Sequence, residues 1–270
     1  MLQTAPGDSS RAKRERTLEW NLDVAAVAGY NAALAGVLAG LAFTVFLLYL
    51  QNKAPENEQI HGGVATNLSV AFLVLIVCAI NYGTLTASPS DSPQALLLLA
   101  VHVPVFGMAI MLLMYCMALA TVGNAVMRGA AKLCSVIVVA LGPTIIMLYI
   151  MLATYDIHTL RCITVCTEPA LTPVYVSTGL SVALAVYGSV LLWWLRYRAP
   201  HREATATRYS VVGWMVLWVV VLDFAVHGYL SLRGLTFWAD NLTQTITACV
   251  MAAALAVFMT LCARVLPQLY

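Results

Sequence analysis

The sequence predicts an all-α, polytopic membrane protein, a bundle of seven transmembrane helices. Of its 270 residues, 61% are hydrophobic and 10% are charged, whereas a soluble domain carries about 25% charged residues. The hydrophobic residues fall into seven long runs, and about 20 residues at ~1.5 Å each cover the ~30 Å hydrocarbon core of a bilayer. The runs are too long and unbroken for barrel strands, which alternate in segments of ~10 residues. The expected spans are 22–51, 62–84, 94–121, 130–153, 173–195, 209–230 and 241–263.

The first span is rich in alanine and glycine. It contains the step Gly36–Gly40, and two small residues four positions apart let helices approach closely. We expect this step to pack inside the bundle, and a dimer face is the alternative.

The third and fourth spans contain Pro104 and Pro143. A proline frees a backbone carbonyl and can kink its helix, which membrane helices tolerate where neighbours or water satisfy that carbonyl. The third span also carries methionines at steps of three, which drift by about 60° each time and wrap half of the helix. We therefore favour gap filling over a copper(I) path for these thioethers. They are Met108, Met111, Met114 and Met117.

The last three spans show two further membrane features. Trp193, Trp194 and Trp238 fall near span ends, where aromatic belts form at the membrane surface. The seventh span is rich in alanine, so we expect a thin helix suited to tight packing.

Residues 1–20 form a polar, basic tail, and 21–270 form one seven-helix domain because the connections are short. We expect no cleavable signal peptide, since the tail has no apolar core and the first run lacks a typical cleavage end. The net charge of +2 is split among tail and loops without a nucleic-acid motif, so we expect no nucleic-acid partner.

The orientation in the membrane is ambiguous. We name face A the side of the tail and of the loops near 85–93, 154–172 and 231–240, and face B the opposite side. Face A holds six Lys and Arg residues and face B holds eight, so the positive-inside rule gives no clear answer. We lean to face A outside because Cys162 and Cys166 lie close together there, as a disulfide in an oxidising compartment would.

Asp223 is the one carboxylate well inside an apolar run. A charge at that depth costs at least ~2.5–3.5 kcal/mol on insertion scales, so it normally faces a partner, a cavity or a pathway. His227 follows one turn later on the same side of the expected helix.

Counting depth from face A brings further polar residues to the level of Asp223. His102 lies about eight residues into the third span, so ~12 Å below face A, and Asp223 lies at the same depth on the returning sixth span. Buried polar groups need partners, so we expect these side chains to converge. The shallower or level companions in other spans are Tyr30, Asn31, Asn81, Asn241 and Gln244.

The spacing of His158, Cys162 and Cys166 would place them on one face if their loop is helical. Imidazole and thiolate suit zinc or copper, but three ligands at this pitch are not a standard zinc pattern. We favour a Cys162–Cys166 disulfide or two free thiols over a metal site.

No motif in the sequence indicates an enzyme. A P-loop, a Gly-x-Ser-x-Gly motif, a His-Glu-x-x-His motif and an acidic pair on one span are all absent. No lysine lies deep in the last two spans, which disfavours a retinal Schiff base, and only His102 and His227 could ligate a haem within the bundle. We expect no cofactor and favour a protein without catalytic activity.

A chain of this length with seven spans and a carboxylate in the sixth resembles the Bax-inhibitor-type calcium-leak proteins and the seven-span cytomegalovirus proteins related to them. The resemblance implies an ion leak. It rests on span number and Asp223, and the second acidic residue of that family, in the seventh span, has no counterpart among Thr243, Gln244, Thr245 and Thr247. Seven-span receptors match in span number, without their Asp-Arg-Tyr or Asn-Pro-x-x-Tyr motifs.

These observations predict an integral membrane protein whose polar cavity at face A binds or conducts a small solute or ion, as a channel, leak or transporter would. Asp223 is its expected central charge, with His102 and His227 as partners. The alternative is a non-catalytic interaction or modulator protein, viral or receptor-like, in which the same residues form a register-fixing hydrogen bond. An intramembrane metal enzyme using these three residues is a third hypothesis. The lipid bilayer is the expected partner throughout, with a homo-oligomer or a membrane partner protein left open.

Overall fold

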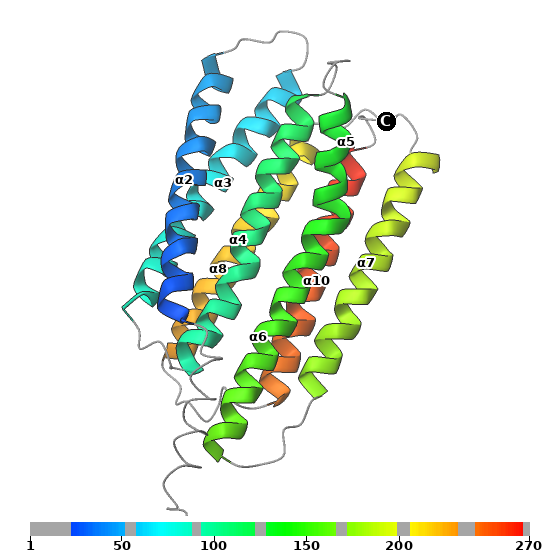
Figure 1. The fold of residues 1–270 in the computed structure, drawn as a ribbon. Helices are drawn as coiled ribbons and strands as arrows, with labels where there is room; N and C mark the ends of the chain where they lie inside the picture. The colour runs from blue at the N-terminus through cyan, green and yellow to red at the C-terminus, as the bar shows by residue number, and fades with distance from the viewer. Residues whose placement is uncertain are drawn as a thin grey trace, which may run out of the picture.

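Seven long helical segments run roughly side by side in the computed structural model (Figure 1). The structure describes residues 23–51, 58–87, 93–121, 128–165, 172–198, 206–231 and 241–266, and no strand occurs among them. The helices are α2 (Val24–Gln51), α3 (Glu58–Leu85), α4 (Pro93–Ala120), α5 (Arg128–Val136) continued by η3 (Ile137–Leu141) and α6 (Gly142–Val165), α7 (Thr172–Arg198), α8 (Ala206–Ser231) and α10 (Asn241–Val265).

The predicted seven-helix fold is confirmed. Seven helices are long and apolar enough to cross a membrane, and their ends agree with the expected spans to within four residues. They form because apolar side chains surround each helix, as bilayer-spanning helices require. The chain is therefore a multi-pass integral membrane protein. The basic tail, 1–20, lies outside the described residues.

Helix α4 is the centre of the bundle. In its apolar window 72% of the residues are buried, against 17% for α2 and 22% for α7. It contacts α2, α3, α5, η3, α6 and α8, whereas α2 and α7 stand at opposite edges of the bundle (Figure 1). A polar residue on α4 is thus far more shielded from lipid than one on α2.

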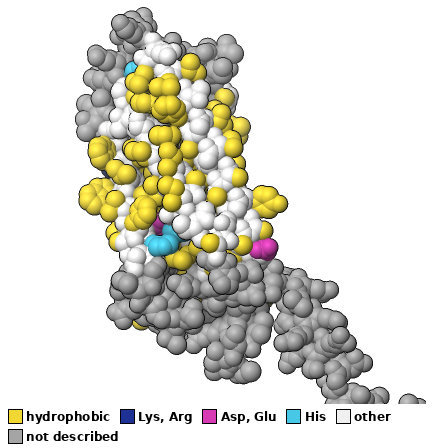
Figure 2. Space-filling view, turned by 90° about the vertical axis from the view of Figure 1, so that its left-hand side faces the viewer, with side chains coloured by type: hydrophobic (Ala, Val, Ile, Leu, Met, Phe, Trp, Pro, Cys, Tyr) yellow, Lys and Arg dark blue, Asp and Glu magenta, His cyan; other side chains and the backbone are white. Residues whose placement is uncertain are grey.

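Hydrophobic side chains cover most of the height of the face drawn in Figure 2, as expected for a surface in contact with lipid. A histidine and an acidic side chain lie next to each other near the lower end of this face.

A π-helical turn, Ile137–Leu141, interrupts the fourth span just before Pro143. The Gly142 N–H donates to the Ile137 carbonyl, five residues back, and a proline at 143 offers no N–H to the Val139 carbonyl four residues back. Helix α7 passes close to this turn at Gly188, where an added Cβ would lie 2.7 Å from the Val139 oxygen and 2.9 Å from the Ala140 Cα. The helix therefore accommodates Pro143 with a π turn, whereas α4 continues as one α-helix through Pro104.

The expectation that Gly36 and Gly40 pack inside the bundle is wrong. Both glycines are exposed, and an added Cβ at either would meet no described atom within 4 Å. The buried residues of α2 include Ala35, Ala39 and Ala42, so a different side of the helix packs on the bundle and the two glycines face outward.

The methionines of α4 follow the expected drift around the helix. Met108 and Met111 are buried, whereas Met117 is 54% exposed. They therefore do not line one stripe, as a metal path would require.

Helices α3 and α8 are tied in the face-B half of the bundle by the buried side chain of Asn67. Its Nδ2 donates to the Tyr209 carbonyl at 2.7 Å, and its Oδ1 accepts from the Gly213 N–H at 3.0 Å. These are the two groups that pair with each other in a regular α-helix. Glycine is needed here, because a Cβ at Gly63 would collide with Tyr209 and a Cβ at Gly213 with Asn67.

Candidate functional site

A chain of three polar side chains lies at the face-A end of the bundle, between α4 and α8. His102 of α4 places Nδ1 3.0 Å from Asp223 Oδ2 and 3.3 Å from Asp223 Oδ1. His102 Nε2 lies 3.0 Å from His227 Nδ1, and the two imidazole rings stack with centroids 5.1 Å apart at 23°. Both nitrogens of His102 are therefore engaged, one on each side.

The local sequence explains this arrangement. Asp223 and His227 are one turn apart on α8, so they share a helix face. That face meets α4 at His102, one of the most shielded positions of the most buried helix.

Asp223 and His102 are fully buried, and His227 is the more exposed end of this three-residue cluster. Asp223 is 2% exposed and His102 1%, whereas His227 is partly exposed. Among the described residues, His102 is the donor found for Asp223, although a carboxylate offers about four acceptor positions. A charge this deep is costly, so the hydrogen bond to His102 is the main described contact that offsets it.

Tyr82 of α3 packs against this cluster and against Phe106 of α4. Its ring meets the His102 ring edge-on, with centroids 6.2 Å apart at 83°. The residue is fully buried, and its hydroxyl has no hydrogen-bond partner within the described part of the chain. Sequence reasoning missed Tyr82, although its neighbour Asn81 marked the same depth of the second span.

No hydrogen bond in the described part of the structure joins Tyr30, Asn31 or Asn81 to these three residues. Asn81 and Gln244 are buried, Asn31 is partly exposed, and Tyr30 is 78% exposed and so lies outside the buried cluster. The structure thus brings together three of the expected residues, His102, Asp223 and His227, from two helices.

Three expectations fall outside what the structure describes. The side chains of Asn241, His158 and Cys162 are not among the described ones, and Cys166 lies outside the described residues. The predicted Cys162–Cys166 disulfide, and the metal site that competed with it, therefore remain predictions.

The three-residue chain does not have the geometry of a metal site. The nitrogens of His102 point at Asp223 and at His227, not at a shared centre as metal ligands do. Within the described residues, no group of three or more His, Cys, Asp or Glu side chains is placed to hold a metal ion. The arrangement suits proton exchange better than metal chemistry.

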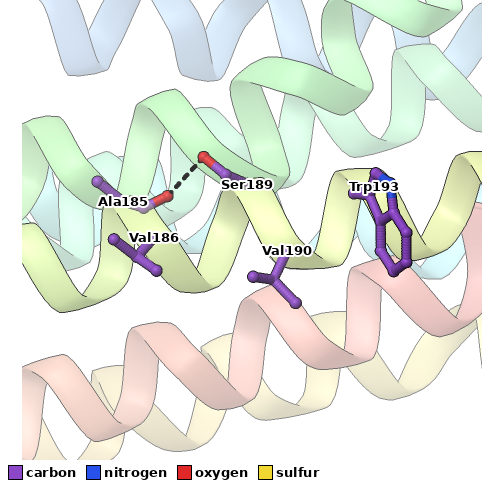
Figure 3. A pocket seen from close by; sticks show the side chains of 5 residues that line it. All are labelled: Ala185, Val186, Ser189, Val190 and Trp193. Atoms are coloured by element: carbon purple, nitrogen blue, oxygen red, sulfur yellow. Dashed lines mark hydrogen bonds between the residues drawn. The ribbon is translucent and has the colours of Figure 1, made fainter.

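Three pockets on the described part of the protein are lined mainly by apolar side chains. The one in Figure 3 has a volume of about 410 Å³ and is lined by Ala185, Val186, Ser189, Val190 and Trp193. All five belong to α7, and the Ser189 hydroxyl donates to the Ala185 carbonyl of the same helix, so this is a depression in the outer surface. Two more pockets lie between helices, and none of the three is lined by His102, Asp223 or His227.

Comparison with known proteins gives no relative from which a function could be inferred. The chain matches no protein-family model, no curated protein and no solved structure.

Proposed function

We propose that this protein takes up protons at face A and passes them through the membrane, as a channel, leak or transporter does. The proton is the small ion that the chemistry of the site favours. The observation that carries the proposal is the unbroken hydrogen-bonded chain from buried Asp223 through His102 to partly exposed His227.

His102, Asp223 and His227 can hold their protons in two arrangements that keep both hydrogen bonds. In the first, Asp223 is a carboxylate, the His102 Nδ1–H donates to it, and the His227 Nδ1–H donates to His102 Nε2. In the second, a proton has been added to His227 Nε2, the His227 Nδ1 proton has moved to His102 Nε2, and the His102 Nδ1 proton has moved to Asp223. His227 Nδ1 now accepts from the His102 Nε2–H, and His102 Nδ1 accepts from the protonated carboxyl of Asp223. One proton enters at the outer end and the carboxylate is neutralised at the inner end.

Histidine suits this role because it is the side chain that ordinarily changes charge between pH 5 and 8. Each ring nitrogen can donate or accept, so one imidazole can pass a proton from one side to the other. Small changes of pH at face A would therefore change how often these three residues carry the additional proton.

The energetic cost of the chain also supports a function. A buried ion pair is often no more stabilising than apolar residues of the same volume, and ionisable groups inside a membrane protein commonly mark ion pathways. A bundle that needed only stability would be served equally well by leucine at positions 102 and 223.

Tyr82 is the residue we assign to the step after the Asp223–His102 pair. A phenol both donates and accepts a hydrogen bond, and this one is fully buried against His102. It would pass a proton between the Asp223–His102 pair and the interior of the bundle.

The test is proton flux into sealed proteoliposomes that hold the purified full-length chain, a pH-sensitive dye and an imposed membrane potential. We expect Asp223→Asn to lower the flux at least tenfold. The matched control is Asp156→Asn, because Asp156 is a partly buried aspartate of α6 that does not belong to the Asp223–His102–His227 cluster. This variant should retain the flux. Equal flux in Asp223→Asn and the wild type, at equal reconstitution, would refute the proposal.

The second candidate is a non-catalytic interaction or modulator protein, and the direct 3.0 Å contact between His102 and Asp223 favours it. In this case the pair only fixes the register of α4 against α8. The double variant His102→Leu with Asp223→Leu separates the two candidates, because apolar replacement of a buried pair can leave a fold intact. A folded double variant without flux supports the proton path, whereas a wild type without flux supports the second candidate.

A further inference from the structure

A second site lies in the face-B half of the bundle, between α2, α3 and α4. It is a pocket of about 300 Å³. Its floor includes the buried side chains of Ala42, Val64 and Leu68, and its mouth includes Leu41 and Val45 of α2, both about half exposed. The pocket exists because α2 packs mainly on α3 and only lightly on α4.

The lining predicts an apolar occupant. Tyr49 and Cys116 carry the only hydroxyl and thiol among its side chains, and the rest are Ala, Val, Leu and Met. An apolar cavity of this kind stays dry, and one of ~150 Å³ is large enough for benzene. The volume here is at the lower end of the ~300–1,000 Å³ range of small-molecule sites, which suits one flexible hydrocarbon chain better than a rigid multi-ring lipid.

The position of the pocket identifies the source of that chain. Its exposed lining residues, Val45 and Met117 among them, lie on spans that cross the hydrocarbon layer. Toward face B, the Tyr49 ring stacks on the His61 ring, with centroids 4.1 Å apart at 15°. Aromatic rings with polar tips are typical of the level where lipid head groups begin.

We propose that this pocket binds one acyl chain of a phospholipid from the face-B leaflet, with the Tyr49–His61 pair beneath its head group. Hydrophobicity alone does not hold the chain there, since lipid tails are as apolar as the lining. The fit comes from dispersion contacts along three helices, which the lining side chains would otherwise lack. The bound lipid would thereby fill the space between α2 and α4.

The test is photo-crosslinking of the full-length chain in bilayers that contain a phospholipid with a diazirine on its acyl chain, followed by mass spectrometry of the labelled peptides. We expect label to be enriched on the α4 segment that contains Met117 and the α2 segment that contains Val45. Val45→Trp places a large ring in the mouth and should lower this labelling at least fivefold. Val37→Trp is the matched control, because Val37 is exposed on the same helix but lies outside the lining.

Two results would overturn the proposal. One is labelling spread evenly over the lipid-facing surfaces of all helices, or equally reduced by Val45→Trp and Val37→Trp. The other is enrichment with a diazirine sterol or a free fatty acid but not with the phospholipid, which would assign the pocket to a different lipid. Proton flux is measured separately on the same variants, so failure here leaves the Asp223 proposal untouched.

Discussion

His102 Nδ1 lies 3.0 Å from Asp223 Oδ2, with 1% of each side chain exposed, and His102 belongs to the most buried of the seven spans. This contact joins the central helix α4 to α8 and leaves the second nitrogen of His102 for His227. One histidine thus links Asp223, the most buried carboxylate of the described residues, to the partly exposed His227.

The first prediction concerns the energetic coupling of His102 and Asp223. In a double-mutant cycle of His102→Gln and Asp223→Asn, the free energies of unfolding should be non-additive by about 0.5–3 kcal/mol, as found for groups in direct contact. The measurement is reversible unfolding in mixed micelles. The control cycle pairs Asp223→Asn with Thr260→Val. The Thr260 hydroxyl contacts Tyr187, between α10 and α7, so the free energies of this cycle should be additive within about 0.5 kcal/mol. Additivity for both pairs would show that the contact contributes no stability.

The second prediction concerns pH. In the proposed path protons enter at His227, so flux at a fixed potential should rise as the pH at face A falls through the histidine range, about 8 to 5. His227→Gln should flatten this rise, because glutamine has no ionisable group there, while the protein stays folded. The pH profile is measured from both faces of the vesicles. A profile that is unchanged in His227→Gln would remove His227 from the path.

The third prediction concerns the packing of α3 on α8. Gly63→Ala should lower the free energy of unfolding by about 1–3 kcal/mol, since its Cβ would collide with Tyr209 and overpacking costs that much. Gly36→Ala is the matched control on α2, where an added Cβ meets no described atom within 4 Å, and its stability should stay within about 1 kcal/mol of the wild type. Equal stabilities for the two variants would contradict the close approach.

The fourth prediction concerns the π turn. Gly188→Ala should destabilise the protein by about 1–3 kcal/mol, because the new methyl group would press on the backbone of Val139 and Ala140. Gly179→Ala lies on the same helix with no described atom within 4 Å of its Cβ and should be nearly neutral. Thermal denaturation of both variants checks this, and a neutral Gly188→Ala would mean that α7 does not lie against the π turn.

The sequence predicts the spans well because bilayer crossing constrains length and hydropathy directly. The level of His102, Asp223 and His227 is also predictable, since helix rise converts residue number into depth. Which side of a helix faces its neighbours is not predictable when apolar residues surround it, and this explains the wrong expectation for Gly36 and Gly40. The same limit separates Tyr30 from the buried cluster and hides Tyr82, because a tyrosine in an apolar run carries no sign of what it contacts.

The π turn is a second feature that sequence alone did not specify. Pro143 indicates a free carbonyl at Val139, but a kink, a bound water or a π turn would each accommodate it. The close approach of Gly188 from α7 accompanies one of these outcomes, and it depends on packing between segments far apart in the chain.

The most direct test of the central claim is the protonation state of Asp223 itself. Infrared difference spectra of the reconstituted protein, recorded while the pH is lowered, should show the carbonyl stretch of a buried carboxylic acid as the chain takes up its proton. The account predicts that this band disappears in Asp223→Asn, persists in Asp156→Asn and shifts its pH midpoint in His227→Gln. A band that persists in Asp223→Asn, or its absence from the wild type at every pH where flux is observed, would contradict the account.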